Sequence, residues 1–116
     1  DYSTGQGIHW FAMFGDFRDP NNVTLEYFNS SGELPSTEVH DWLYATKKKL
    51  EECVSAKVII VTRIAHQKSE TECGVFSLWY LFSRLNNIPY SYFDNVDAVT
   101  DDMMYKFRKH LYRKTI

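Results

Sequence analysis

The sequence predicts one α+β domain, in which a small mixed β-sheet packs against helices. The chain has 116 residues, the length of a single domain, and 44% of them are hydrophobic, which is enough for a packed core. Segments typical of strands and of helices follow one another in the order β, β, α, β, α, α. Because the chain has no internal repeat, low-complexity tract or linker, these segments are expected to form one unit over residues 1–116.

The first two strands are expected to pair as a hairpin. Residues 8–14 are mostly apolar and carry His9 near their start, whereas residues 23–28 have the β-branched and aromatic composition of a second strand. The Gly, Asp, Pro and Asn residues of segment 15–22 favour a turn between them. Asn29 opens another turn, so it closes the strand that is predicted to pair with the one carrying His9.

A helix is expected over residues 36–53 and a strand over residues 57–62. Ser36 or Thr37 can cap the helix just after Pro35. Apolar residues at helical spacing should face the core, while three lysines should face solvent. They are Val39, Trp42, Leu43, Leu50 and Val54 and, on the outer side, Lys47, Lys48 and Lys49. The β-branched strand is too short for a core helix, so we expect it to be buried.

Two further helices are expected to complete the domain. Residues 73–85 are apolar enough for a buried helix, which should end at the Asn-Asn-Ile-Pro segment 86–89. Thr100 and the two aspartates after it can cap a last helix that runs from Met103 to about Tyr112. Acidic residues at its start and basic residues toward its end suit the helix dipole.

Composition argues against several classes of protein. The net charge is −2, and the basic stretches 47–49 and 106–114 are too short for the basic stripe of a nucleic-acid-binding domain. No apolar run reaches the length of a membrane span. Cys53 and Cys73 are too few for a disulfide scaffold and lack zinc-type spacing, so we expect free thiols and neither a metal nor a cofactor. Residues 1–7 contain no signal peptide and no initiator Met, so we expect an excised or processed piece of a longer protein.

Cys73 is the candidate nucleophile. It lies where an apolar helix is predicted to begin, and a helix N-terminus lowers the pKa of a thiol. Gly74 beside it leaves room for a substrate backbone, and Gln67 could donate its amide N–H to an oxyanion together with the Cys73 backbone N–H. Taken alone, however, a free cysteine is more often a small buried apolar residue, and Gln67 could equally be a loop residue facing water.

Four histidines could supply a base. His66 adjoins Gln67 in the loop before Cys73, and His9 lies at the start of a strand; periodicity does not choose between them. We expect His40, on the helix predicted at 36–53, and His110, among basic residues near the end of the last helix, to be surface groups.

The residue that orients the base is expected at a strand end. Asn29 is favoured, because paired strand ends would bring it within reach of His9, although a turn-forming asparagine is the commoner role. Asp16, Asp19 and Glu26 are less favoured alternatives.

The order of these residues resembles that of the adenain-like and ubiquitin-like-protein-specific cysteine peptidases. His9-Trp10, Asn29, Gln67 and Cys73-Gly74 follow the family order of His, then an acid or Asn, then Gln, then Cys. The six-residue step from Gln67 to Cys73 and the Cys-Gly-Val-Phe continuation are the specific parts. The branch that matures polyproteins in large DNA viruses, which uses Asn as the orienter, is similar over nearly the whole chain. The similar segments are 1–10, 26–30, 66–74 and 104–111.

The resemblance implies a role for each residue. Cys73 would be the nucleophile, His9 the general base and then acid, Asn29 the orienter and Gln67 the oxyanion donor. Trp10 would wall a narrow channel for small residues beside Gly74. The chain would be the C-terminal, catalytic part of the fold, without a substantial N-terminal segment that family members have.

The resemblance also implies a function. The protein would be a cysteine endopeptidase that cuts after Gly-Gly-type sites to mature viral structural polyproteins. Its partners would be polypeptides with a Gly-Gly-X site, including virion core or capsid proteins, at assembly sites in the host cytoplasm and in the virion. The alternatives are a deconjugase of ubiquitin-like modifiers and a non-catalytic virion structural domain that keeps the protease fold.

Overall fold

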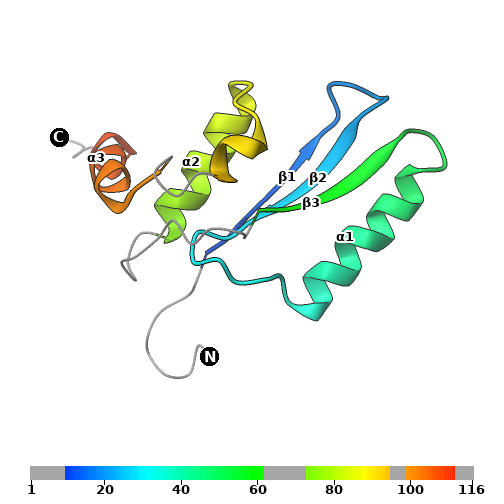
Figure 1. Cartoon of the computed structure of the whole chain (residues 1–116), viewed down its shortest axis with the longest axis horizontal. Helices are drawn as coiled ribbons and strands as arrows, with labels where there is room; N and C mark the ends of the chain where they lie inside the picture. The colour runs from blue at the N-terminus through cyan, green and yellow to red at the C-terminus, as the bar shows by residue number, and fades with distance from the viewer. Residues whose placement is uncertain (1–9, 62–72, 95–98, 112–116) are drawn as a thin grey trace.

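The computed structural model describes residues 10–61, 73–94 and 99–111, without the side chains of Cys73, His110 and Leu111 (Figure 1). The α+β class predicted from the sequence is confirmed. The elements of the described residues are β1 (Ala12–Asp16), β2 (Val23–Phe28), α1 (Thr37–Leu50), β3 (Ala56–Val61), α2 (Cys73–Leu85), the short 3-10 helix η2 (Tyr90–Asp94) and α3 (Asp101–Leu111).

The three described strands form one mixed sheet in the order β1-β2-β3. β1 and β2 are antiparallel, with Ala12 opposite Phe28, which confirms the predicted hairpin. β3 runs parallel to β2, with Val61 also opposite Phe28. The connection between two parallel strands must cross from one end of the sheet to the other, and helix α1 provides that crossover.

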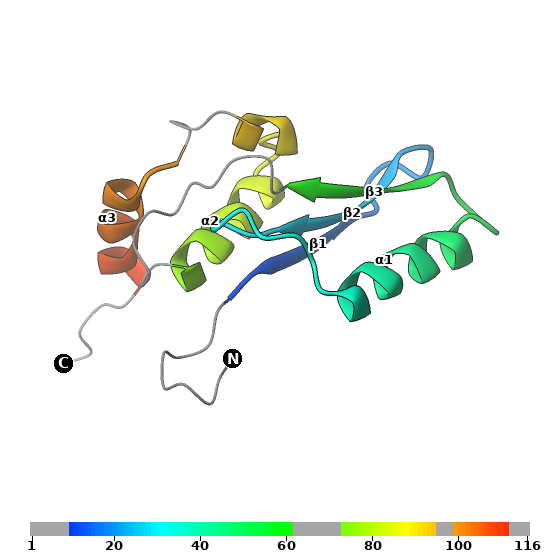
Figure 2. The ribbon, with the colours of Figure 1, turned by 60° about the horizontal axis from the view of Figure 1, so that its bottom comes forward.

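The central strand β2 divides two apolar layers. All six of its residues are buried, and alternate side chains point to opposite faces of the sheet. On one face Leu25 and Tyr27 pack with Leu43 of α1. On the other face Phe28 packs with Tyr80 of α2, and their stacked ring centroids lie 4.6 Å apart. Figures 1 and 2 show the same arrangement, with α1 on one side of the sheet and α2 and α3 on the other.

β1 begins and ends later than predicted. It starts at Ala12 instead of residue 8, and it includes Gly15 and Asp16, which were expected in the turn. The physical reason is pairing: Gly15 lies opposite Leu25 and Asp16 opposite Thr24, so the buried strand β2 extends its partner. Residues 8 and 9 lie outside the described part of the chain.

Helix α1 confirms the predicted cap but not every predicted core residue. The Ser36 hydroxyl accepts a hydrogen bond from the Val39 N–H at 3.3 Å, as an N-cap does. Leu43 is buried, whereas the side chain of Trp42 is 55% exposed, so its prediction as a core residue was wrong. Trp42 lies on the flank of α1 that looks over β1, and α1 makes its main sheet contacts with β3.

The strand predicted at 57–62 is β3, and it is less buried than expected. Ala56 and Val61 are buried, but Val58, Ile59 and Ile60 are only partly so. β3 lies at the side of the described sheet away from β1, so it has a neighbour on one side only within that sheet.

Helices α2 and α3 follow the predicted boundaries closely. α2 has the predicted span, and Asn87 follows it with a φ of 68°, a left-handed conformation that ends helices and that Asn tolerates. α3 begins at Asp101, two residues before the predicted Met103, and the Thr100 hydroxyl caps it by accepting the Met103 N–H at 3.2 Å. The turn of η2 was not predicted; its Tyr92 N–H bonds the Pro89 carbonyl at 3.0 Å.

No helix within the described ranges is both long and apolar enough to cross a bilayer. Within the same ranges, no three His, Cys, Asp or Glu residues are grouped so that they could hold a metal ion.

Asp16 gives the fold a specific sensitivity to acid. The side-chain hydrogen bond from Arg18 lowers the pKa of the Asp16 carboxyl from 3.8 to about 2. A depressed folded-state pKa contributes stability above the unfolded-state value, and that contribution disappears as the pH falls from about 4 to about 2. Asp16→Asn should therefore lower the free energy of unfolding at pH 7, with the difference from the parent protein shrinking over that range. Urea unfolding at several pH values measures it, and a constant difference down to pH 2 would contradict the assignment.

Candidate active site

The structure describes the surroundings of three of the six predicted site residues. These are Trp10, Asn29 and Gly74, whereas His9 and Gln67 lie outside the described residues. Cys73 is described by its backbone alone, as the first residue of α2. The described part of the site therefore consists of Asn29 and of Trp10 and Gly74, the chain neighbours of the proposed base and nucleophile.

Trp10 lies against the first turn of α2. A Cβ atom placed on Gly74 would lie 3.5 Å from Cδ1 and 3.7 Å from Cγ of the Trp10 indole, which is ordinary van der Waals contact. Trp10 directly follows His9, and Gly74 directly follows Cys73. The contact therefore joins the two chain segments that carry the predicted base and nucleophile, although they are far apart in the sequence. The indole is 58% exposed, so it forms an open wall beside the helix start.

The space at Gly74 predicts how substitutions there affect stability. Gly74→Ala should keep the fold and raise the free energy of unfolding by about 0.5 kcal/mol, because alanine restricts the unfolded chain and its methyl group fits beside Trp10. Gly74→Leu is the matched comparison: its longer side chain requires the indole to move and should give no such gain. Chemical denaturation of both variants checks this, and a large loss of stability in Gly74→Ala would contradict the described contact.

Asn29 is buried at the end of β2, close to the start of β1. Its amide N–H₂ donates to the Tyr27 hydroxyl at 3.0 Å, and its carbonyl oxygen accepts from the Ser31 N–H at 3.0 Å and the Ser31 hydroxyl at 2.7 Å. The bond to the Ser31 N–H is the turn-forming role weighed for this residue. Asn29 is only 2% exposed, whereas a residue that only forms a surface turn does not need to be buried.

The Tyr27 hydroxyl fixes the orientation of the Asn29 amide. Burial raises the pKa of the Tyr27 phenol, so the group keeps its proton and donates it to the Glu33 carbonyl at 3.3 Å while accepting from Asn29. The Tyr27 ring also contacts Phe11, with centroids 5.1 Å apart. Asn29 is thus held in one orientation next to the residues that follow His9.

The other acids considered as orienters have different partners. Asp16 is bonded by Arg18 at 2.9 Å and by Arg84 at 3.1 Å. Asp19 accepts the Asn21 N–H at 2.9 Å, which is a turn contact. Glu26 is occupied by a buried network, so Asn29 stays the favoured candidate.

His40 is an exposed residue of α1, as predicted. Its Nδ1 lies 3.3 Å from Asp41 Oδ1, and its ring packs against the Tyr44 ring with centroids 4.7 Å apart. The side chain of His110 lies outside the description.

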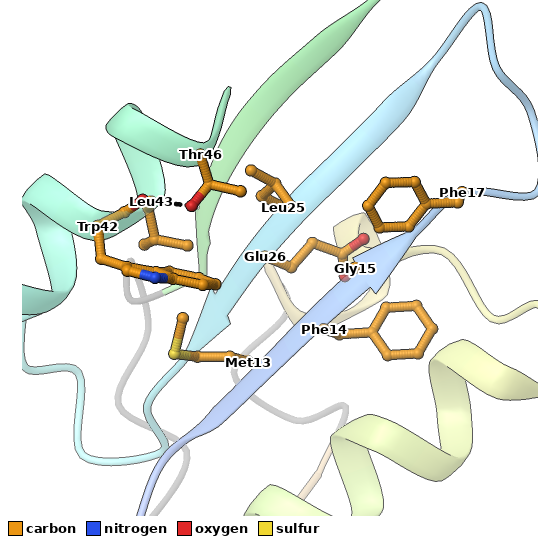
Figure 3. Close-up of a pocket in the computed structure, with 9 residues that line it drawn as sticks. All are labelled: Met13, Phe14, Gly15, Phe17, Leu25, Glu26, Trp42, Leu43 and Thr46. Carbon is orange, nitrogen blue, oxygen red and sulfur yellow. Dashed lines mark hydrogen bonds between the residues drawn. The ribbon is translucent and has the colours of Figure 1, made fainter. Parts of the chain in front are cut away.

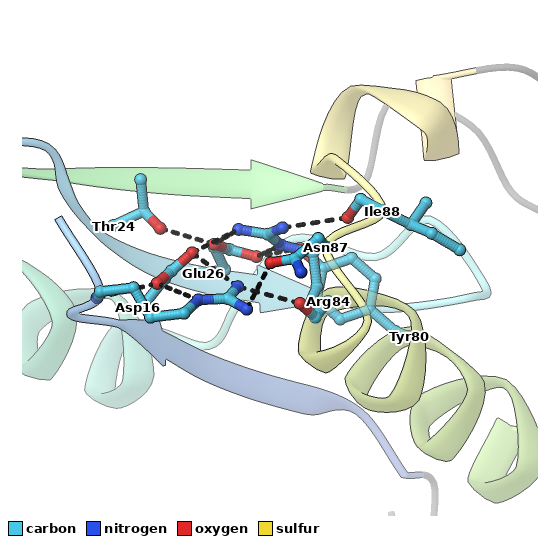
Figure 4. Close-up of polar contacts among 8 residues, drawn as sticks. Asp16, Thr24, Glu26, Tyr80, Arg84, Asn87 and Ile88 are labelled. Carbon is cyan, nitrogen blue, oxygen red and sulfur yellow. Dashed lines mark hydrogen bonds and ion pairs between the residues drawn. The ribbon is translucent and has the colours of Figure 1, made fainter.

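A buried polar network joins β2 to α2, and sequence reasoning missed it (Figure 4). Glu26 is fully buried and is bonded by Tyr80, Arg84 and Thr24. The bond to Glu26 raises the pKa of the Arg84 guanidinium, and burial raises the pKa of the Tyr80 phenol, so Arg84 stays charged and Tyr80 stays protonated. The available signal was the presence of one acid in a strand of mostly apolar residues and of one basic residue in the most apolar helix.

The cavity shown in Figure 3 lies next to α1, and Glu26 of this network is among its lining residues. It has a volume of about 240 Å³ and opens between α1 and β1. Met13, Phe17 and Trp42 are among its mostly apolar lining residues. Neither Trp10 nor Gly74 lines it, so it is separate from the candidate active site.

The chain is similar in sequence to viral cysteine proteases. No family model matches it. It is 45% identical over 114 residues to proteins of African swine fever virus described as "SUMO-1 cysteine protease" (Pretoriuskop isolate) and "Cysteine protease" (Malawi isolate). The match covers 97% of this chain and 41% of those proteins, so the chain spans about two fifths of their length. A protein of Acanthamoeba polyphaga mimivirus, named as a candidate thiol protease, is 30% identical over 78% of this chain and 28% of its own.

The fold is also that of solved proteases. One crystal structure of the African swine fever virus protease, in its selenomethionine form, matches with a TM-score of 0.87 and 44% identity over 99% of this chain and 42% of that chain. A second matches with a TM-score of 0.85 and 42% identity over 92% of this chain and 40% of that chain. The resemblance predicted from the order of the motifs is confirmed, as is the fold class.

Proposed function

Because the chain is homologous to part of the cysteine proteases of African swine fever virus, we propose that it is the catalytic portion of a cysteine endopeptidase. The observation that carries this proposal is the position of the Trp10 indole beside Gly74, within van der Waals contact of a Cβ atom placed there. It supports a site in which the segment with His9 and the helix start with Cys73 lie side by side. Membership in a protease family alone would not connect these two segments in this chain.

In the proposed mechanism each residue acts on a stated atom. His9 takes the proton of the Cys73 thiol, and the thiolate attacks the scissile carbonyl carbon, so that an S–C bond forms. The Cys73 backbone N–H, at the first position of α2, and the Gln67 amide donate to the resulting oxyanion. His9 then gives its proton to the leaving amine, and water releases the acyl group from sulfur. Asn29 Oδ1 accepts the remaining imidazole N–H in place of the Ser31 hydroxyl and holds the ring in position.

The proposed substrates have small residues before the cleaved bond. An indole wall against a glycine favours a Gly-Gly pair, because larger side chains would compete with Trp10 for the same space. Gly74→Ala should accordingly weaken cleavage even though it preserves the fold. We assign the activity to the maturation of viral structural polyproteins, acting on virion core or capsid precursors at assembly sites in the host cytoplasm and in the virion.

A second candidate function is removal of a ubiquitin-like modifier. The description of one relative as a SUMO-1 cysteine protease favours it, and the Gly-Gly tail of such a modifier would fit the same channel.

A panel of substrates separates these functions. The full-length protein would be offered Gly-Gly-X peptides, a viral precursor protein and a SUMO-1 conjugate. Faster cleavage of the precursor supports polyprotein maturation, and faster cleavage of the conjugate supports deconjugation. Cleavage of none of them would overturn both and favour a structural domain that keeps the fold.

Asn29 provides a test of the proposed orienter. Asn29→Ala should lower kcat by roughly 10- to 100-fold, because the imidazole loses its acceptor and Ser31 loses both of its bonds to the amide. Asn29→Asp keeps an acceptor of the same shape and should retain most of the activity. Steady-state kinetics of the two variants, with their unfolding curves as a control for stability, measure the difference. Equal activity of Asn29→Ala and the parent protein would remove Asn29 from the mechanism.

A further inference from the structure

The carboxylate of Glu26 uses all of its hydrogen-bonding positions, and most of its donors come from α2. Its Oε1 accepts from the Tyr80 hydroxyl and from Arg84 Nε at 2.7 Å. Its Oε2 accepts from Arg84 Nη2 at 2.9 Å and from the Thr24 hydroxyl at 2.6 Å. Three of these four bonds therefore connect the strand to the helix, and Glu26 has no exposed surface. Figure 4 shows the contacts converging on this carboxylate.

The helix is held at two points that lie one turn apart. Tyr80 and Arg84 are at i and i+4, on one face of α2, so both can reach the same carboxylate. Arg84 is held further by Asp16 at 3.1 Å and by the Ile88 carbonyl at 3.0 Å. Two anchors along the axis oppose rotation and sliding of the helix as well as its separation from the sheet.

The same strand carries the proposed orienter. Glu26 and Phe28 point toward α2, and Asn29 is the next residue after the strand. The stacked rings of Phe28 and Tyr80 add an apolar contact between the Glu26 anchor and this strand end. A shift of α2 against β2 at Glu26 would therefore change the spacing between the helix and Asn29.

The distance from the anchor to the helix start amplifies small movements. Cys73 lies about nine residues before the middle of the Tyr80–Arg84 anchor, or about 14 Å at roughly 1.5 Å per residue. A tilt of about 5° at the anchor would move the helix start by about 1 Å, and a misplacement of about 1 Å can cost about 100-fold in rate.

We propose that Glu26 is a positioning residue, which fixes the helix that begins at Cys73 relative to the strand end that carries Asn29. This inference rests on the proposed function. Tyr80 and Arg84 are the groups through which Glu26 acts, and none of the three touches the substrate.

A purely structural role would lower stability without changing the thiol of the folded protein, so the test measures that thiol. The parent full-length protein would be compared with Glu26→Gln and Tyr80→Phe at a temperature where unfolding curves show each to be folded. Tyr80→Phe removes one hydroxyl bond from α2 to the Glu26 carboxylate and keeps the ring stacked on Phe28. Thr24→Val is the matched control, because it also removes one hydroxyl bond to this carboxylate, but one that lies within β2. The exposed Cys53 is the internal reference.

The readouts are the rate of alkylation of Cys73 by iodoacetamide as a function of pH, followed by peptide mass, and the separate values of kcat and KM. Both test variants should alkylate Cys73 roughly tenfold more slowly near neutral pH, with the midpoint of the pH profile raised and kcat lowered at nearly constant KM. Thr24→Val should match the parent protein.

Each outcome decides between specific claims. Folded variants whose Cys73 is alkylated as fast as in the parent protein would overturn the positioning role. An equal loss of alkylation rate in Thr24→Val and Tyr80→Phe would overturn it as well. If Glu26→Gln does not fold, Tyr80→Phe decides alone. A parent protein in which Cys73 reacts no faster than Cys53 would instead overturn the proposed function, and the positioning role with it.

Discussion

Cys73→Ala is expected to abolish cleavage of a Gly-Gly-X peptide, with kcat/KM falling by at least about 10⁴-fold. The proposed mechanism passes through a bond to the Cys73 sulfur, and no other residue of the site replaces it; losses of this size are typical of removed nucleophiles. The assay is steady-state cleavage by the full-length protein. Cys53→Ala is the matched control, because Cys53 is an exposed free thiol outside the proposed site and its removal should leave the rate within about twofold. Undiminished cleavage by Cys73→Ala would end the assignment of the nucleophile.

Arg84→Met is expected to lower the free energy of unfolding by about 3–5 kcal/mol. The substitution leaves the Glu26 carboxylate fully buried without its cation, and breaking one partner of a buried pair typically costs that much. Urea denaturation measures the change. Arg18→Met is the control. Arg18 bonds Asp16, the Asn87 side chain and the Arg84 carbonyl, but it is nearly half exposed, so its loss should cost less than about 1 kcal/mol. Similar costs for the two variants would show that burial does not set the strength of this network.

A double variant separates stability from position. Replacing Glu26 by Leu together with Arg84→Met removes both buried charges, which is often close to neutral for stability. We therefore expect this variant to recover much of the lost stability while Cys73 alkylation stays slow. Recovery of both properties would favour a purely structural network.

The helix starts and the end of α2 were predictable because short polar side chains mark them, whereas α1 ends at Leu50, three residues before the predicted residue 53. Ser36 and Thr100 cap the helices that follow, and Asn87 takes the left-handed conformation after α2. These interactions are local in sequence, so a pattern of a few residues contains them. The hairpin was predictable for the same reason, since its turn residues lie between two strand-like runs.

The strand limits and the exposure of Trp42 depend on tertiary contacts. β1 extends to Asp16 because the buried strand beside it supplies hydrogen bonds, and turn propensities do not include such pairing. Trp42 has the spacing of a core residue, but its flank of α1 overlooks β1 at one side of the described sheet. The helical spacing of apolar residues defines one face of a helix, but it does not show which part of the protein covers that face.

The sequence shows the order of the candidate site residues, whose roles stay predictions, but it does not show the buried network that supports them. The contact of Trp10 with Gly74 agrees with the expected meeting of strand start and helix start. The network around Glu26 joins residues more than 50 positions apart, and its acid was considered only as a less favoured orienter. A buried charge in an apolar strand implies a partner, but the sequence does not show which of the chain's basic residues it is.

The most direct test of the central claim is covalent labelling by a Gly-Gly peptide that ends in a vinyl sulfone. The Cys73 thiolate would add to the vinyl carbon and form a stable thioether, and peptide mapping would locate it. The proposed mechanism predicts one adduct per chain, on Cys73, and this adduct should form slowly or not at all in His9→Ala. Equal labelling of Cys53 and Cys73, or labelling of Cys73 that is unchanged in His9→Ala, would contradict it.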